Sequence, residues 1–180
     1  MTFLILGLVL WAAAHLFKRI APGPRARLGD PAKGLVALAL VASVALMVIG
    51  YRSAEFVYLW DPPRFLIHVN NLLMLGAVFL FTADGVRAPI IGGMRHPQLT
   101  AVKIWATAHL LVNGDLASVI LFGGLLAWAV VEVIVINRAQ PVWTPKPVKP
   151  GANLKAVIGT VLGTAIIMAI HGWIGPHPWP

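Results

Sequence analysis

Residues 95–115 read RHPQLTAVKIWATAHLLVNGD, and they bring charged and polar side chains into a sequence that is otherwise largely apolar. Of the 180 residues, 59% are hydrophobic and only 11% are charged. A soluble domain carries about 25% charged residues. The composition therefore predicts an integral membrane protein. Polar groups within a membrane are costly and are usually retained for a function, so this stretch is the first place to look for one.

Composition also limits the chemistry. The chain has no cysteine, which excludes disulfides, iron–sulfur clusters, thiolate ligation of haem and a cysteine nucleophile. It has no phosphate-binding glycine loop, zinc-protease motif or nucleophile elbow, which argues against a hydrolase. The net charge of +8 indicates basic loops beside anionic lipid, and we expect no nucleic-acid partner.

Six apolar segments predict an all-α, polytopic transmembrane bundle of about six spans within a single domain over residues 1–180. The segments cover residues 2–17, 34–51, 65–83, 97–113, 116–136 and 153–174. Most approach the roughly 20 residues that a spanning helix needs. The fourth is short and the most polar, so a tilted or a partly re-entrant helix are both open. Asn113-Gly114-Asp115 predicts a tight turn, with the two flanking spans as an antiparallel hairpin.

The distribution of positive charge predicts the orientation. Eleven of the fourteen Lys and Arg residues fall after the first, third and fifth segments or just inside the sixth. The positive-inside rule then places these loops in the cytoplasm and both termini outside. Within the membrane, Lys103 and Glu132 are expected at similar depth on neighbouring spans. We predict an ion pair between them, with independent snorkelling to the headgroups as the alternative.

Six histidines are the candidate metal ligands. His68 and His171 are expected near the outer ends of their spans, and His177 lies in the proline-rich tail. His109 is the deepest and shares a helical face with Trp105 and Asn113. A neutral imidazole can be a structural residue satisfied by hydrogen bonds, or it can bind a metal through one nitrogen. Histidines on two helices of a bundle are what a bis-histidine haem requires.

Several motifs resemble the NnrU family of bacterial membrane proteins. They are RHPQ at 95–98, the run WATAHLLVNGD at 105–115, Ser118, His15, Gly50-Tyr51-Arg52, and Leu59-Trp60-Asp61-Pro62-Pro63. The resemblance covers most of the chain. It implies a protein of the bacterial inner membrane that is associated with nitrogen-oxide respiration, the nitrite and nitric oxide reductase function of denitrification. The lipid bilayer and a respiratory or nitrogen-oxide reductase complex are the partners that it implies.

The 15-cis-zeta-carotene isomerases are relatives with a similar RHPQ segment, an Ala-His pair in the following helix and an early histidine. They hold haem b through the two histidines, which correspond to His15 and His109 here. His96 is the alternative partner of His15, because it lies at a more similar depth. Arg87 and Arg95 are candidates to neutralise the haem propionates. The isomerases also carry a cysteine where this chain has Ala106, and this departure argues against isomerase activity.

Three functions therefore remain open from the sequence. The first is a haem b protein that serves electron transfer, sensing or the support of nitrogen-oxide reductases. The second is a membrane assembly or transport factor without haem, whose histidines are structural. The third is a haem-dependent cis–trans isomerase of a polyene lipid. The sequence leaves open whether the protein is an enzyme, and it contains no signal for the oligomeric state.

Overall fold

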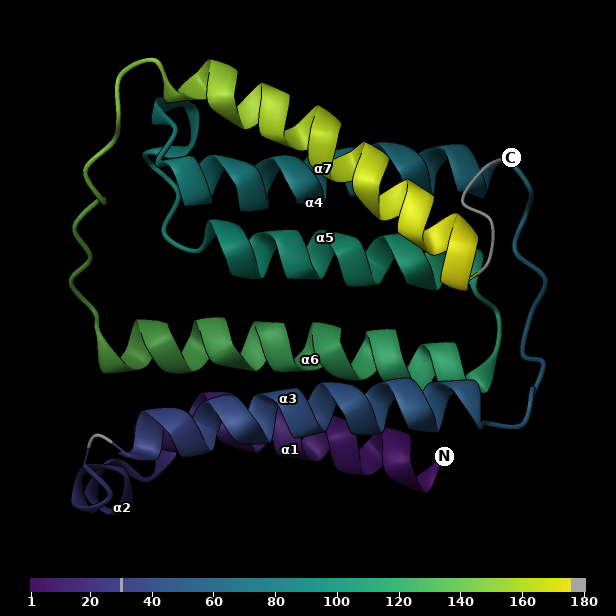
Figure 1. The fold of residues 1–180 in the computed structure, drawn as a ribbon, viewed down its shortest axis with the longest axis horizontal. Helices are drawn as coiled ribbons and strands as arrows, with labels where there is room; N and C mark the ends of the chain where they lie inside the picture. Colours follow the sequence, from purple (N-terminus) through teal and green to yellow (C-terminus); the bar gives the residue numbers. More distant parts are fainter. Residues whose placement is uncertain (30, 176–180) are drawn as a thin grey trace. The chain divides into compact units, whose positions relative to one another are not determined.

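The computed structural model describes residues 1–29 and 31–175, in which all regular secondary structure is helical (Figure 1). The helices are α1 (Thr2–Ile20), α2 (Pro22–Arg27), α3 (Pro31–Arg52), α4 (Leu66–Val86), α5 (Pro97–Val112), α6 (Leu116–Ala139) and α7 (Ala152–Ile174). A short 3-10 helix, η1 (Pro89–Ile91), precedes α5. The predicted all-α class is confirmed. His177 lies outside the described residues.

Five of these helices are long and apolar enough to cross a membrane: α1, α3, α4, α6 and α7. The predicted helical membrane protein is therefore confirmed. Helix α1 continues to Ile20, three residues beyond the predicted end of the first span. Helix α5 has 16 residues, which at 1.5 Å per residue gives about 24 Å and is shorter than the hydrocarbon core of about 30 Å. It is the short, polar segment noted in the sequence.

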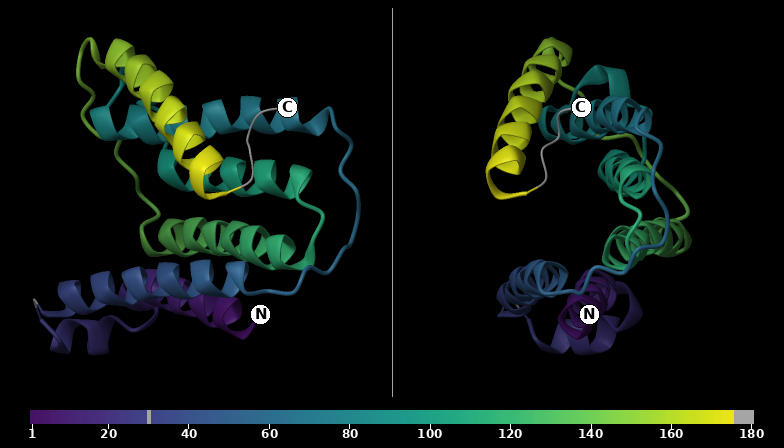
Figure 2. Two further views of the ribbon diagram at one scale, coloured as in Figure 1. Left: turned by 45° about the vertical axis from the view of Figure 1, so that its right-hand side comes forward. Right: turned by 90° about the vertical axis from the view of Figure 1, so that its right-hand side faces the viewer.

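Within the predicted domain, the chain forms two compact units. The first unit contains residues 1–60 and 113–139, with α1, α2, α3 and α6. Helices α1 and α3 lie side by side and antiparallel (Figures 1 and 2). Glycines allow their close approach. A Cβ at Gly50 would collide with the backbone of Leu4, and one at Gly7 would lie 2.8 Å from the backbone oxygen of Ser43. Helix α6 packs against α1 in the same unit.

The predicted break between helices at Asn113-Gly114-Asp115 is confirmed, since α5 ends at Val112 and α6 begins at Leu116. The antiparallel hairpin of the two flanking spans stays a prediction, because α5 and α6 belong to different units. The carbonyl of Gly114 accepts hydrogen bonds from the backbone N–H groups of Leu59 (2.8 Å) and Trp60 (3.1 Å). A side chain at Gly114 would collide with Trp60. The loop at 57–60 is thereby attached to the start of α6 in the first unit.

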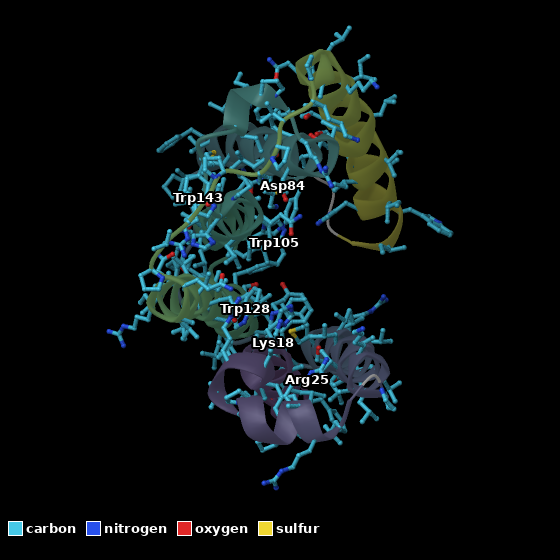
Figure 3. All side chains as sticks on the ribbon, turned by 90° about the vertical axis from the view of Figure 1, so that its left-hand side faces the viewer. Lys18, Arg25, Asp84, Trp105, Trp128 and Trp143 are labelled. Atoms are coloured by element: carbon cyan, nitrogen blue, oxygen red, sulfur yellow. The ribbon has the colours of Figure 1, made fainter. Side chains whose placement is uncertain are left out.

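The second unit contains residues 61–112 and the chain from Gln140 onward, with α4, η1, α5 and α7. Helices α5 and α7 both pack against α4. The hydroxyl groups of Thr82 on α4 and Thr160 on α7 are 2.9 Å apart. The segment at 140–151 also belongs to this unit. In it, Nζ of Lys146 lies 3.0 Å from Oδ1 of Asp84. Figure 3 shows Asp84 near the end of α4. Small buried residues permit this packing, among them Ala83, Ala88, Ala152 and Ala156.

Candidate functional site

His15 lies on α1 in the first unit and is held by its own helix. Its Nδ1 is 3.0 Å from the carbonyl oxygen of Trp11, four residues earlier. Because a carbonyl oxygen can only accept, Nδ1 carries the proton and donates it. The lone pair of the neutral imidazole is then on Nε2. This is the tautomer that a metal-binding histidine needs.

Two tryptophans enclose the ring of His15. The ring centre of Trp11 is 4.3 Å from that of His15, and the ring centre of Trp128 on α6 is 4.6 Å from it. The two indoles meet edge to face at 5.3 Å, which is a favourable aromatic geometry. Figure 3 shows Trp128 on the side of α6 that faces α1. The imidazole is thus contacted by one indole from its own helix and by one from α6.

An ion pair lies one helical turn beyond this aromatic cluster. Arg19 Nε is 3.6 Å from Glu132 Oε1, and Glu132 is only 7% exposed. We had predicted Lys103 as the partner of Glu132, and this prediction is corrected: the carboxylate pairs with Arg19 of α1. The reason is helix packing, since α6 packs against α1 in the first unit, whereas α5 with Lys103 belongs to the second.

Three buried polar atoms near His15 have no hydrogen-bond partner among the described residues. They are Nε1 of Trp11, Nε1 of Trp128 and Oε2 of Glu132. Buried polar groups are nearly always satisfied by protein, water or ligand. Two unsatisfied indole N–H groups can donate to a carboxylate or another acceptor. The surroundings of His15 are therefore suited to a ligand that brings polar atoms.

His109 lies on α5 in the second unit and repeats the arrangement of His15. Its Nδ1 donates to the carbonyl oxygen of Trp105, four residues earlier, at 2.9 Å. The two rings have centres 5.1 Å apart. On its other side is a second histidine, His171 of α7, with its ring centre at 6.5 Å. Nδ1 is thus the protonated nitrogen of His109, and Nε2 carries the lone pair.

An apolar cavity of about 280 Å³ lies among the three long helices of the second unit. Its wall includes Trp105 of α5, one turn before His109, and Ile167 of α7, one turn before His171. The remaining lining residues come from α4 and α5 and are Met74, Ala77, Val78, Phe81 and Val102. Cavities of this kind, mostly apolar with a few polar groups at one end, are typical of cofactor sites.

The comparison with known families agrees with the motifs in the sequence. The family model described as NnrU protein matches residues 3–178, nearly the whole chain. The chain belongs to the NnrU family. No curated protein and no solved structure matches the chain.

Several residues that carry the NnrU resemblance have structural contacts in the first unit. Ser118, fully buried, hydrogen-bonds Tyr51 at 2.8 Å and donates to Asp115 at 2.5 Å. The backbone N–H of Ser118 also donates to Asp115, at 2.9 Å. This network joins the end of α3 to the start of α6. These NnrU residues therefore secure the helix ends.

Arg95 and His96, the other predicted site residues of the NnrU chain, lie just before α5 in the second unit. The guanidinium of Arg95 donates to the carbonyl oxygen of Gln140, which ties it to the segment that follows α6. The carbonyl oxygen of His96 accepts from Thr100 in the first turn of α5, at 2.9 Å. Both residues thus help to begin the helix that carries His109.

The structure reveals a repeat that the sequence analysis missed. Residues 11–15 read WAAAH and residues 105–109 read WATAH, so the two predicted ligands occupy the same five-residue pattern. A search for short repeats around the histidines would have found it. In both copies the tryptophan carbonyl binds Nδ1 and its indole lies against the imidazole. We refer to these two segments of the NnrU chain as the Trp–His modules.

The donor set of the described residues fits haem better than a bare metal ion. No group of three or more His, Asp or Glu side chains is close enough to hold an ion within residues 1–29 and 31–175. Haem needs only one or two ligands from the protein, because the porphyrin supplies four. Histidines with an oriented Nε2 meet this requirement.

Proposed function

We propose that this NnrU-family protein binds haem b through His15 and His109. The observation that supports the proposal is the pair of Trp–His modules. In each, a backbone carbonyl holds Nδ1 and so presents Nε2 as the ligand nitrogen. In a metal-binding histidine, the ring nitrogen that does not bind the metal usually donates a hydrogen bond to a carbonyl, a carboxylate or water. The two modules share both this hydrogen bond and the adjacent tryptophan.

The surroundings of the two modules also favour a large, mostly apolar cofactor. Haem supplies one-electron chemistry when it is bound. The apolar cavity beside Trp105 and the aromatic cluster around His15 are suited to a macrocycle. The indole N–H groups of Trp11 and Trp128 are candidate donors to its propionates.

We place this function in the bacterial inner membrane, with the basic loops in the cytoplasm, and in support of nitrite and nitric oxide reductases. The charge distribution supports the orientation. Membership of the NnrU family supports the link to nitrogen-oxide respiration. A respiratory complex in the same membrane is the proposed partner.

An absorption spectrum tests the haem proposal most directly. Protein expressed with ample haem and purified in detergent is expected to show a Soret band and a low-spin ferric spectrum. His109→Ala is expected to lose most of the haem. His96→Ala is the matched control and should retain it, since His96 lies at the other end of α5. A wild-type protein without a Soret band, still monodisperse in detergent, contradicts the proposal.

The physiological part of the proposal needs a separate experiment in cells. A strain that lacks the protein is expected to accumulate nitrite or nitric oxide under denitrifying conditions. The wild-type gene should restore consumption, and the His109→Ala gene should fail at equal abundance in the membrane. Full restoration by His109→Ala would favour the assembly or transport factor whose histidines are structural.

The isomerase alternative depends on one further residue. Ala106 is fully buried in α5, at the position where the related isomerases carry a cysteine. The purified haem-loaded protein is therefore expected to leave cis-polyenes unchanged. Conversion of a cis-polyene to its trans form would instead establish this alternative.

A further inference from the structure

His109 and His171 lie at a separation that one metal ion can bridge. Their ring centres are 6.5 Å apart and their planes differ by 43°. Two imidazoles on opposite sides of one metal, with bonds of about 2 Å to each nitrogen, have ring centres roughly 6 Å apart. A rotation between the planes about the shared nitrogen–metal–nitrogen axis leaves both bonds intact. The observed separation of the ring centres is therefore the separation expected for two imidazoles that share one metal.

The two histidines also occupy equivalent positions at one end of the second unit. Helices α5 and α7 both run antiparallel to α4, so their C-terminal ends lie at the same end of the unit (Figures 1 and 2). His109 is three residues from the end of α5, and His171 is three residues from the end of α7. The two imidazoles are thus at matching depth.

The apolar cavity is lined by residues one helical turn before each member of the pair. Trp105 and Ile167 line it, and they precede His109 and His171 by one helical turn each. The histidine pair and the residues that line the apolar cavity all belong to the second unit.

We infer that His171 is a second imidazole ligand for the metal that His109 binds. This inference rests on the proposed haem function for the identity of the metal, but it concerns the histidine pair itself. His171 occupies the ligand position opposite His109 when His15 is not there. The protein then has three histidines for two axial positions, with His109 common to both pairs.

Ferric spectra of single and double variants test the inference in the haem-loaded protein. His15→Ala is expected to remain low-spin, because His171 completes the coordination. The double variant His15→Ala/His171→Ala should become high-spin, whereas the matched control His15→Ala/His96→Ala should stay low-spin. A high-spin His15→Ala single variant would overturn the inference and leave the His15–His109 pair intact. An identical low-spin spectrum in both double variants would also overturn it.

A haem-free experiment keeps the inference testable if the protein binds no haem. Copper(II) is a suitable probe because imidazole nitrogens bind it well. The haem-free protein is expected to give an electron paramagnetic resonance signal with two coupled nitrogens. His109→Ala or His171→Ala should lose one nitrogen and weaken binding by about tenfold or more, while His15→Ala leaves the signal unchanged. A copper signal that is insensitive to His171→Ala would contradict the histidine pair.

Discussion

The two Trp–His modules have nearly the same sequence but different neighbours. In the first unit, a second tryptophan and a buried ion pair surround His15. In the second unit, another histidine and an apolar cavity lie beside His109. The helix supplies the same hydrogen bond to Nδ1 in both cases. The local sequence orients each imidazole, and the helices that pack around it decide what the imidazole can bind.

The alanines of the modules show the same contrast. Ala106 and Ala108 in the second module are fully buried, whereas Ala12 and Ala14 in the first are only half-buried. The second module therefore packs closely on its neighbours along more of its surface. His15 is held mainly by aromatic contacts, and His109 by close packing of the backbone of its helix. Four substitutions can break or sharpen this comparison.

The largest effect on the free energy of unfolding is expected in the aromatic cluster around His15. Trp128 is 8% exposed and contacts both Trp11 and His15. Trp128→Ala leaves a large cavity and is expected to lower the free energy of unfolding by about 4 kcal/mol. This loss is measured by unfolding the protein in mixed micelles of increasing SDS content and monitoring its helicity by circular dichroism. Trp173→Ala is the control, because Trp173 is 85% exposed and should change stability by less than about 0.5 kcal/mol. Equal losses would contradict the buried cluster.

The ion pairs of the two units give the next contrast. Arg19→Ala leaves the buried carboxylate of Glu132 without its cation and is expected to cost about 3 kcal/mol. Lys146→Ala removes the partner of Asp84, but the Lys146 side chain is 65% exposed, so the cost should be below about 1 kcal/mol. Adding Glu132→Gln to Arg19→Ala should recover stability. If it does not, the pairing of Arg19 with Glu132 is not what holds this end of α1.

Enlarging equivalent alanines tests the packing of the two modules directly. Ala108→Leu forces a larger side chain into a fully buried position and is expected to cost about 2 kcal/mol. Ala14→Leu, at the equivalent half-buried position, should stay within about 0.5 kcal/mol. The same unfolding titration compares them. The contrast between the modules fails if Ala14→Leu is the more damaging change.

The smallest effect is expected for a polar contact between helices of the second unit. Thr160→Val removes the hydroxyl that lies 2.9 Å from that of Thr82. Hydrogen bonds between membrane helices contribute about 0.6 kcal/mol on average. The loss should be of that size in the unfolding titration, and Thr107→Val at an exposed site of α5 should cost less. A larger loss would mean that polar contacts, and not small-residue packing, hold α7 on α4.

Much of the fold follows from local properties of the sequence. The length of each apolar segment predicted where the long helices lie, since hydropathy and helix length are set by neighbouring residues. The break between helices at Asn113-Gly114-Asp115 was also predicted correctly, because these residue types favour a loop whatever surrounds them. The short α5 was recognised as an unusual segment by its polar residues. The pairing of spans was less predictable, as Glu132 shows.

By itself, the sequence determined the membrane class, the positions of the helices and the NnrU family, because hydropathy, helix length and motifs are properties of neighbouring residues. Only the tertiary structure decided that Glu132 meets Arg19 and that His109 meets His171. Apolar spans are nearly uniform around their circumference, so their sequence does not show which face meets a neighbour. The rotation of each helix depends on close contacts between small residues of different helices, and those contacts exist only in the folded chain.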